Sequence, residues 1–261
     1  MTPRMLNLVS LVVFASSLFM RSIDPVIPQI AHGLAVELST AALLSTAFSL
    51  PYALIQPVLG ALADMMSKVR LMLLCLLIVT AASIVSALVT NIEMLMAARV
   101  VAGLSAGGVV PISFAIIGDK VPVAQRQVAM GRLLFAIMTG NLLGATVAGV
   151  VGDLVGWRGV FLVNGGFGLA VLALAAPGFR GFAETQSRSD LSELIPNYRS
   201  ILRNPLAKYC FGAVFLEALF MYGVFPYIAT LLHQVGETRA SIAGVVIGGF
   251  GIGGALYGVF V

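Results

Sequence analysis

Four charged residues lie inside long apolar stretches of the sequence, where a charge needs a chemical reason. They are Arg21, Asp24, Arg99 and Glu217. A charge at the centre of a membrane helix costs roughly 2.5–3.5 kcal/mol on insertion scales, so each is a candidate for a function. Burial favours the neutral form of a carboxyl group and a nearby arginine favours the ionised form, so a carboxyl group under both influences can exchange a proton. We expect Asp24 and Arg99 to form a proton-coupling pair; the alternative is a static ion pair that only orients helices.

The positions of these charges along their apolar runs predict their depths. Counting 1.5 Å per residue from the nearer run ends places Asp24 ~9 Å and Arg99 ~10 Å below the same surface. The same count places Arg21 and Glu217 ~14 Å deep, near the midplane. We expect a central, water-accessible cavity, and the residues predicted to line it are Arg21, Glu217, Asn141 and Tyr222. For Asn141 and Tyr222 the alternative is ordinary helix packing.

The composition identifies the elements that must position these groups. The chain has 261 residues, of which 59% are hydrophobic and 10% charged, and its mean hydropathy is +1.03. Soluble domains carry about 25% charged residues, so this composition excludes a soluble enzyme, a nucleic-acid-binding domain and a disordered protein. The pI of about 9.3 comes from scattered residues rather than a basic face, so we expect no nucleic-acid partner.

Eight apolar runs are each close to the ~20 residues that a helix needs to cross a bilayer core of ~30 Å. They are residues 6–30, 40–62, 71–90, 92–117, 127–151, 158–176, 208–232 and 240–261. The alternating pattern of a transmembrane β-barrel is absent. The sequence therefore predicts an all-α membrane protein. Its expected parts are a six-helix bundle over 1–176, a polar cytoplasmic linker over 177–207 and two helices of an incomplete second bundle over 208–261.

Basic residues predict the orientation of these spans. Placing the connections alternately on two sides puts eleven of the 15 Lys and Arg residues on the side of the N-terminus and two on the other. Loops rich in Lys and Arg stay in the cytoplasm. We expect a multi-pass protein of the plasma membrane, specifically a bacterial inner membrane, with a cytoplasmic N-terminus.

Prolines and glycines predict local geometry within the spans. Pro25 and Pro28 follow Asp24 and should kink the first span; freed carbonyls there could line a cavity, although a kink without a ligand is the alternative. Small residues at four-residue spacing let helices pack closely, or provide a sliding or sealing face between bundles. The positions predicted for helix packing are Gly103, Gly140, Gly144 and Gly149.

Several motifs, in order along the chain, resemble those of the major facilitator superfamily. Residues 60–70 (GALADMMSKVR) resemble its G-x-L-a-D-r-x-G-r-k signature, with Met65 and Ser67 at the positions of the usual Arg and Gly. Residues 99–107 resemble an R-x-x-x-G-x-x-x-G motif associated with proton coupling. The stripe in run 127–151 resembles an antiporter motif with Ala145 in place of proline. Residues 24–28 resemble the D-x-x-x-P of drug and sugar efflux members.

This resemblance implies a fold and a function. Members have twelve or fourteen helices, with six-helix bundles made of two inverted three-helix repeats, so a missing second half would be needed for a complete transporter. The loop with Gly60, Asp64 and Lys68 would be a gating loop that helps to set the conformational state. The implied activity is proton-coupled antiport, the efflux of a small organic solute such as a drug or sugar. It needs a bilayer, protons and a proton gradient but no metal or cofactor, and it is not enzymatic. The alternative is an inactive or structural membrane fragment.

Overall fold

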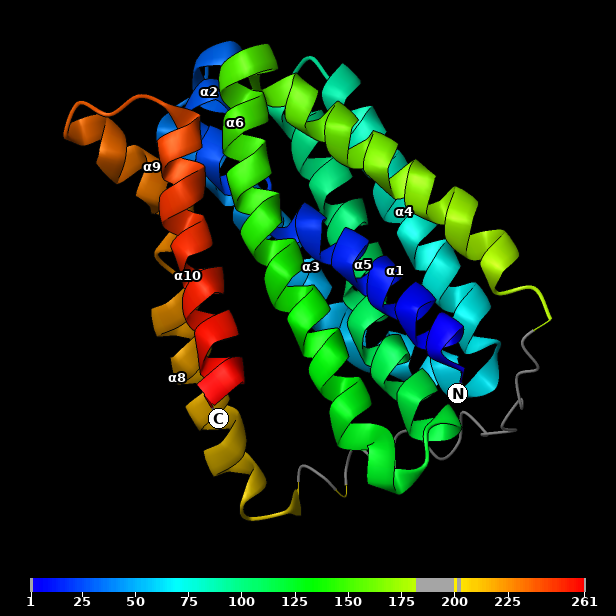
Figure 1. Ribbon diagram of the computed structural model, residues 1–261. Coiled ribbons are helices and arrows are strands. Elements are labelled where there is room, and N and C mark those ends of the chain that lie inside the picture. Colours follow the sequence, from blue (N-terminus) through cyan, green and yellow to red (C-terminus); the bar gives the residue numbers. More distant parts are fainter. Residues whose placement is uncertain (1, 182–199, 201–202, 261) are drawn as a thin grey trace.

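The computed structural model describes residues 2–181, 200 and 203–260, and every regular element in this part of the chain is a helix (Figure 1). The elements are α1 (Pro3–Arg21), the 3₁₀ helix η1 (Asp24–Val26), α2 (Ile27–Gly33), α3 (Leu38–Met65), α4 (Lys68–Leu88), α5 (Ile92–Lys120), α6 (Val123–Gly178), α8 (Ala207–Tyr222), α9 (Phe225–Gln234) and α10 (Ala240–Phe260). The prediction of an all-helical fold is confirmed.

By length and composition, six helical stretches of the described residues could cross a membrane, and Ala240–Gly249 is a shorter apolar helix. The stretch α6 holds two of the predicted runs. Its 56 residues would extend ~84 Å as a straight helix, far more than one bilayer core. At Gly156 the backbone has φ +76°, which glycine adopts readily, and there the chain turns back so that α6 forms two limbs (Figure 1).

The first predicted span is broken next to Asp24, as the prolines predict. The α1 helix ends at Arg21, and the chain continues as η1 and then α2. Pro25 and Pro28 both lie in the first turn of the helix that follows, where a missing N–H group leaves no helix hydrogen bond unmade. The chain therefore changes direction without leaving its apolar surroundings.

The observed helix ends differ from the predicted runs in two places. Residues 208–232 fall in two helices, because α8 ends before Gly223 and Pro226 lies in the first turn of the new helix α9; together they form one stretch long enough to cross a membrane. The connection between α3 and α4 is shorter than the predicted loop with Gly60, Asp64 and Lys68. Gly60 and Asp64 lie within α3, since no helix breaker stands between them, and Lys68 is the first residue of α4. Only Met66 and Ser67 separate these helices.

The packed helices have two ends that we name by residues. In Figure 1 the N-terminus and the turn between α5 and α6 lie toward the lower end, and we call this the Lys68 end. The upper end holds α2, the bend of α6 and the loop between α9 and α10, and we call it the Gly156 end. The core lies between α1, α3, α4, α5 and α6, which pack on one another.

The two helix sets pack very differently. The first set is α1–α6 and the second is α8–α10. The α10 helix packs along α6, and α9 packs against η1 and α2. The α8 helix is exposed along nearly its whole length, including the large side chains of Phe211, Phe215 and Phe220. Division into domains at 176 and 207, and the pairing of three-helix repeats, stay predictions.

Candidate functional site

The carboxyl group of Asp24 is the centre of a buried polar cluster. Asp24 is the first residue of η1 and is only 1% exposed. One carboxylate oxygen accepts a hydrogen bond of 2.7 Å from the Ser45 hydroxyl of α3. The other accepts a 3.3 Å hydrogen bond and ion pair from the Arg21 guanidinium at the end of α1. One charged and one neutral donor thus satisfy both oxygens of a carboxylate that is buried away from water.

Arg99 of α5 lies beside this cluster without pairing directly with Asp24. It is 3% exposed and interacts with the Asp24 charge electrostatically, whereas the ion pair of Asp24 is with Arg21. The Arg99 guanidinium donates hydrogen bonds of 3.5 Å to the carbonyls of Phe19 and Leu44 and lies 4.3 Å from the centre of the Phe48 ring. One terminal nitrogen of Arg99 has no hydrogen-bond partner among the described residues.

The break in the first span explains why Arg99 finds an acceptor there. The last four carbonyls of a helix lack partners within the helix. Because α1 ends at Arg21, the Phe19 carbonyl is one of these, and both Ser22 and Arg99 donate to it. The predicted kink therefore supplies a freed carbonyl to the charged cluster.

The cluster also reaches the second helix set. The Arg21 guanidinium lies 4.3 Å from the centre of the ring of Phe225, which is the first residue of α9. Phe225 is itself buried and packs with Ala145 of α6 and Ile247 of α10. Arg21 thus contacts a carboxylate of the first set and an aromatic ring of the second.

The structure brings together only part of the predicted cavity. Arg21 joins Asp24, with Arg99 beside them, but Glu217 is exposed on α8 and has no ion pair or hydrogen bond with another described residue. Asn141 of α6 is half-buried, and its side-chain oxygen has no partner in the described part of the chain. The side chain of Tyr222 lies outside the described residues. The cavity roles of these residues stay predictions.

The residues of the predicted gating loop lie at the Lys68 end. The Lys68 ammonium forms a 2.9 Å ion pair with Asp119 at the end of α5. A side chain at Gly60 would meet nothing within 4 Å. The side chain of Asp64 lies outside the described part of the structure. Lys68 therefore joins α4 to α5, and the gating role stays a prediction.

The predicted packing glycines lie at helix contacts. A Cβ atom added to Gly140 or Gly144 would lie 2.7 or 2.6 Å from the carbonyl oxygen of Phe14 or Leu18, both on α1. A Cβ at Gly103 would meet the Phe48 backbone of α3. A Cβ at Gly149 would meet the Ala240 backbone of α10. The small residues set the distances of α1 and α10 from α6 and of α3 from α5.

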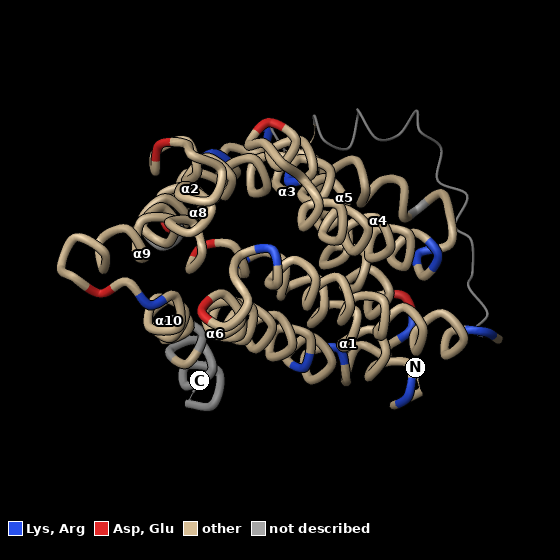
Figure 2. The backbone as a smooth tube through the Cα atoms, turned by 90° about the horizontal axis from the view of Figure 1, so that it is seen from above, with Lys and Arg blue, Asp and Glu red and all other residues tan. Residues whose placement is uncertain are grey.

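Sequence reasoning missed three residues of the cluster: Ser45, Phe48 and Phe225. A signal existed for Ser45, because it lies five residues into its apolar run, ~8 Å deep and level with Asp24. For Phe225 the sequence signal was Pro226, which marks the break between α8 and α9, but its contact with Arg21 depends on the tertiary structure. Figure 2 shows how few charged stretches there are in the otherwise uncharged tube.

Comparisons with known proteins agree with this architecture. The family model described as Major Facilitator Superfamily matches residues 9–261. The chain is 26% identical over 243 residues to the uncharacterized MFS-type transporter YwfA of Bacillus subtilis. This match covers 92% of this chain and 59% of YwfA. It is 28% identical over 155 residues to the multidrug export protein EmrB of Escherichia coli K12, covering 59% of this chain and 30% of EmrB.

A solved structure shares the fold. The chain resembles a bacterial homolog of the human lysosomal transporter Spinster, in an inward-facing and unoccupied conformation, with a TM-score of 0.77 and 21% identity. That match covers 94% of this chain and 59% of the other. The chain thus spans about three fifths of the length of YwfA and of this homolog. On the family match and the membrane-spanning helices, the chain belongs to the major facilitator superfamily, a family of multi-pass membrane transporters and not of enzymes.

Proposed function

We propose that this transporter exports a small organic solute in exchange for protons, with Asp24 as the proton-carrying group. The observation that supports this is the Asp24 carboxylate, buried at a break in a membrane helix between Arg21, Ser45 and Arg99. A membrane charge with this many dedicated contacts is expected to have a function.

Protonation of Asp24 would change its contacts in a defined way. The ionised carboxylate accepts from Arg21 and Ser45. A protonated carboxyl group is neutral and becomes a donor, so it no longer balances the Arg21 charge. Loss of the proton restores the ion pair with Arg21.

Arg21 connects this chemistry to the arrangement of the helix sets. Its guanidinium contacts Asp24 on one side and the Phe225 ring on the other. If α9 moves away from η1, Arg21 loses the ring and its electrostatic surroundings change. The balance between the two forms of Asp24 then depends on the conformation, which is the requirement for coupling proton movement to transport.

The finer parts of the proposal rest on resemblance and charge. EmrB is named a multidrug export protein, which favours export of a drug-like solute. The energy source would be the proton gradient, without a metal or cofactor. The excess of Lys and Arg on one side favours a cytoplasmic N-terminus in a bacterial inner membrane.

A second candidate is a chain that is inactive alone and acts as a structural part of a membrane assembly. It is favoured by the large exposed apolar side chains of α8. Exposed apolar surface of this extent is covered by lipid or by further helices. Proton flux separates the two candidates.

The test uses the purified chain in lipid vesicles carrying a pH gradient and a proton-sensitive dye. We expect a lipophilic cationic drug to release protons with the wild-type chain, and Asp24→Asn to abolish this release. The matched control is Glu37→Gln, an exposed carboxyl group that accepts a hydrogen bond from nearby Ser39. Unchanged flux and pH dependence in Asp24→Asn would refute the coupling proposal, and no flux from the wild-type chain would favour the second candidate.

A further inference from the structure

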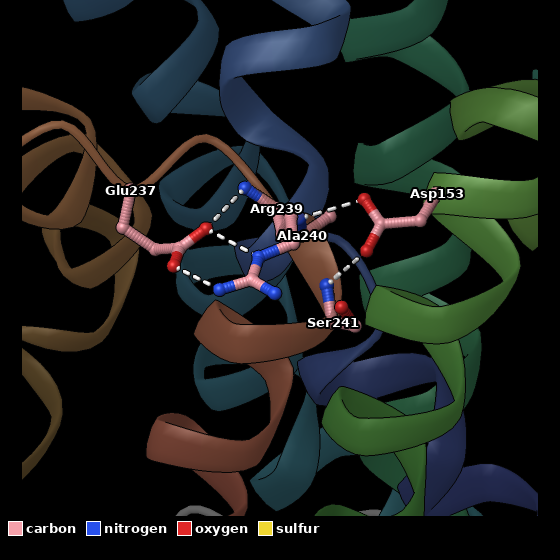
Figure 3. Close-up of polar contacts among 5 residues, drawn as sticks. All are labelled: Asp153, Glu237, Arg239, Ala240 and Ser241. Carbon is pink, nitrogen blue, oxygen red and sulfur yellow. Dashed lines mark hydrogen bonds and ion pairs between the residues drawn. The ribbon is translucent and has the colours of Figure 1, made fainter.

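A carboxylate of the first helix set caps the first turn of a helix in the second set. Asp153 lies on α6 just before the bend at Gly156, and its two oxygens accept 2.8 Å hydrogen bonds from the backbone N–H groups of Ala240 and Ser241 (Figure 3). Both donors belong to the start of α10. Each carboxylate oxygen thus has its own backbone donor.

This contact has a clear physical basis. The first four N–H groups of a helix have no acceptor inside the helix, and the helix dipole favours a negative charge beside them. Such a group is usually capped by a residue just before the helix. Here the acceptor comes from a residue 87 positions earlier, so the cap joins two separate helices.

The carboxylate in the loop before α10 does not cap the Ala240 and Ser241 N–H groups, so Asp153 is their acceptor. Glu237 is occupied by Arg239, whose side chain donates to both carboxylate oxygens at 2.8 and 2.6 Å (Figure 3). Hydrogen bonds from Arg239 lower the pKa of Glu237 to about 2, so this pair stays ionised at neutral pH. Arg239 also attracts the Asp153 carboxylate, while its ion pair is with Glu237.

Glycines bring the two helices close enough for the cap to form. Gly149 lies one turn before Asp153, and a Cβ there would meet the Ala240 backbone. Farther along the same contact, a Cβ at Gly244 would lie 2.5 Å from the Ala145 carbonyl oxygen. The helices are thus in backbone contact at the Gly156 end, whereas α8, which begins toward the Lys68 end, is exposed (Figure 1).

We propose that Asp153 is a latch that holds the two helix sets together at the Gly156 end. The latch is closed while its carboxylate caps α10, and it opens when the first turn of α10 leaves Asp153 as the sets separate at this end. When the latch opens, the Ala240 and Ser241 N–H groups and the Asp153 carboxylate lose their hydrogen bonds to one another. Water can form hydrogen bonds with each of them instead, because Asp153 is at an exposed position.

The test measures the distance between spin labels in the 261-residue chain in lipid nanodiscs. The labels are placed on cysteines at Val155 of α6 and Val235 after α9, both exposed, in a Cys210→Ser background that keeps the buried Cys75. We expect one short distance in the wild type and an added population at longer distance in Asp153→Ala. Asp153→Asn keeps one acceptor oxygen and should give a smaller added population.

Two controls keep the result decisive. Glu37→Gln removes an exposed carboxylate that has no contact with the cap, and it should leave the distance unchanged. A label pair at Val155 and Leu88, both in the first set, should also stay unchanged.

Equal distance distributions in the wild type and Asp153→Ala would overturn the latch, as would a change in the Val155–Leu88 pair, which would show local unfolding of α6. If Asp153→Ala is not recovered folded, Asp153→Asn decides by the same criterion. Because no solute or proton gradient is used, failure of the latch is distinct from failure of the proposed exchange.

Discussion

Two membrane helices are broken in nearly the same way, yet the two breaks carry opposite chemistry. In the first, α1 gives way to η1 and α2 at the sequence Asp24-Pro25; in the second, α8 gives way to α9 at Phe225-Pro226. Each proline begins a new helical turn. The residue before the first proline is a buried carboxylate, and the residue before the second is a buried aromatic ring.

The difference teaches how a charge can be kept at such a break. Arg21 lies between the two, paired with Asp24 and stacked on Phe225. The first break provides a partner charge, a hydroxyl group and a freed carbonyl, whereas the second provides an apolar ring. In the proposed function the proton-exchanging group is Asp24 at the first break, and the second break would act on it through Arg21.

The largest effect is expected from Arg21→Ala, which removes the charge that the two breaks share. Loss of one partner of a buried ion pair leaves the other charge uncompensated and costs about 3–5 kcal/mol. We expect a strongly reduced melting temperature in detergent. Adding Asp24→Asn should restore much of the lost stability, because it removes the uncompensated carboxylate. A double variant no more stable than Arg21→Ala would contradict the pairing.

A smaller effect is expected from Ser45→Ala, which removes a neutral donor from the first break only. Hydrogen bonds to charged groups contribute about 1.5–3 kcal/mol. Chemical denaturation of Ser45→Ala should show a free energy of unfolding lower by this amount. Ser39→Ala, which removes an exposed hydroxyl that donates to Glu37, is the matched control and should change stability little. Equal stabilities of the two variants would argue against a tight contact between Ser45 and Asp24.

Phe225→Leu removes the aromatic ring that the Arg21 guanidinium contacts at the second break. A buried cation–π contact contributes about 0.5–2 kcal/mol. We expect a modest loss of stability and, in the vesicle assay, a displaced pH profile of proton flux. Phe225→Tyr keeps an aromatic face and should retain the wild-type profile. A profile unaffected by Phe225→Leu would show that the second break does not act on Asp24.

The smallest effect is expected from Pro226→Ala. A proline at a compatible position stabilises a protein by about 0.4–1 kcal/mol through the unfolded chain, and alanine would lose this amount. Pro25→Ala is the matched change at the first break. Its effect on proton flux should be much larger, because there the backbone positions Asp24. Similar flux in both variants would remove the distinction between the breaks.

Much of this arrangement could be predicted from particular residues. The apolar runs predict the helices because backbone groups in lipid must be satisfied within a helix. Pro25 predicts the first break, and counting residues predicts that Asp24 and Arg99 lie level. The break at Gly223 was not predicted, because the run was interpreted as one helix although Pro226 is a signal of the same kind as Pro25.

The sequence by itself determined that this chain spans a membrane many times and holds a few costly charges within it. Those properties depend on composition and on spacing along one helix, which a sequence states directly. Only the tertiary structure decided that Arg21 pairs with Asp24 and rests on Phe225, and that Asp153 caps α10. These contacts join residues up to 204 positions apart, and they depend on which helices the glycine-lined faces meet, which no local pattern records.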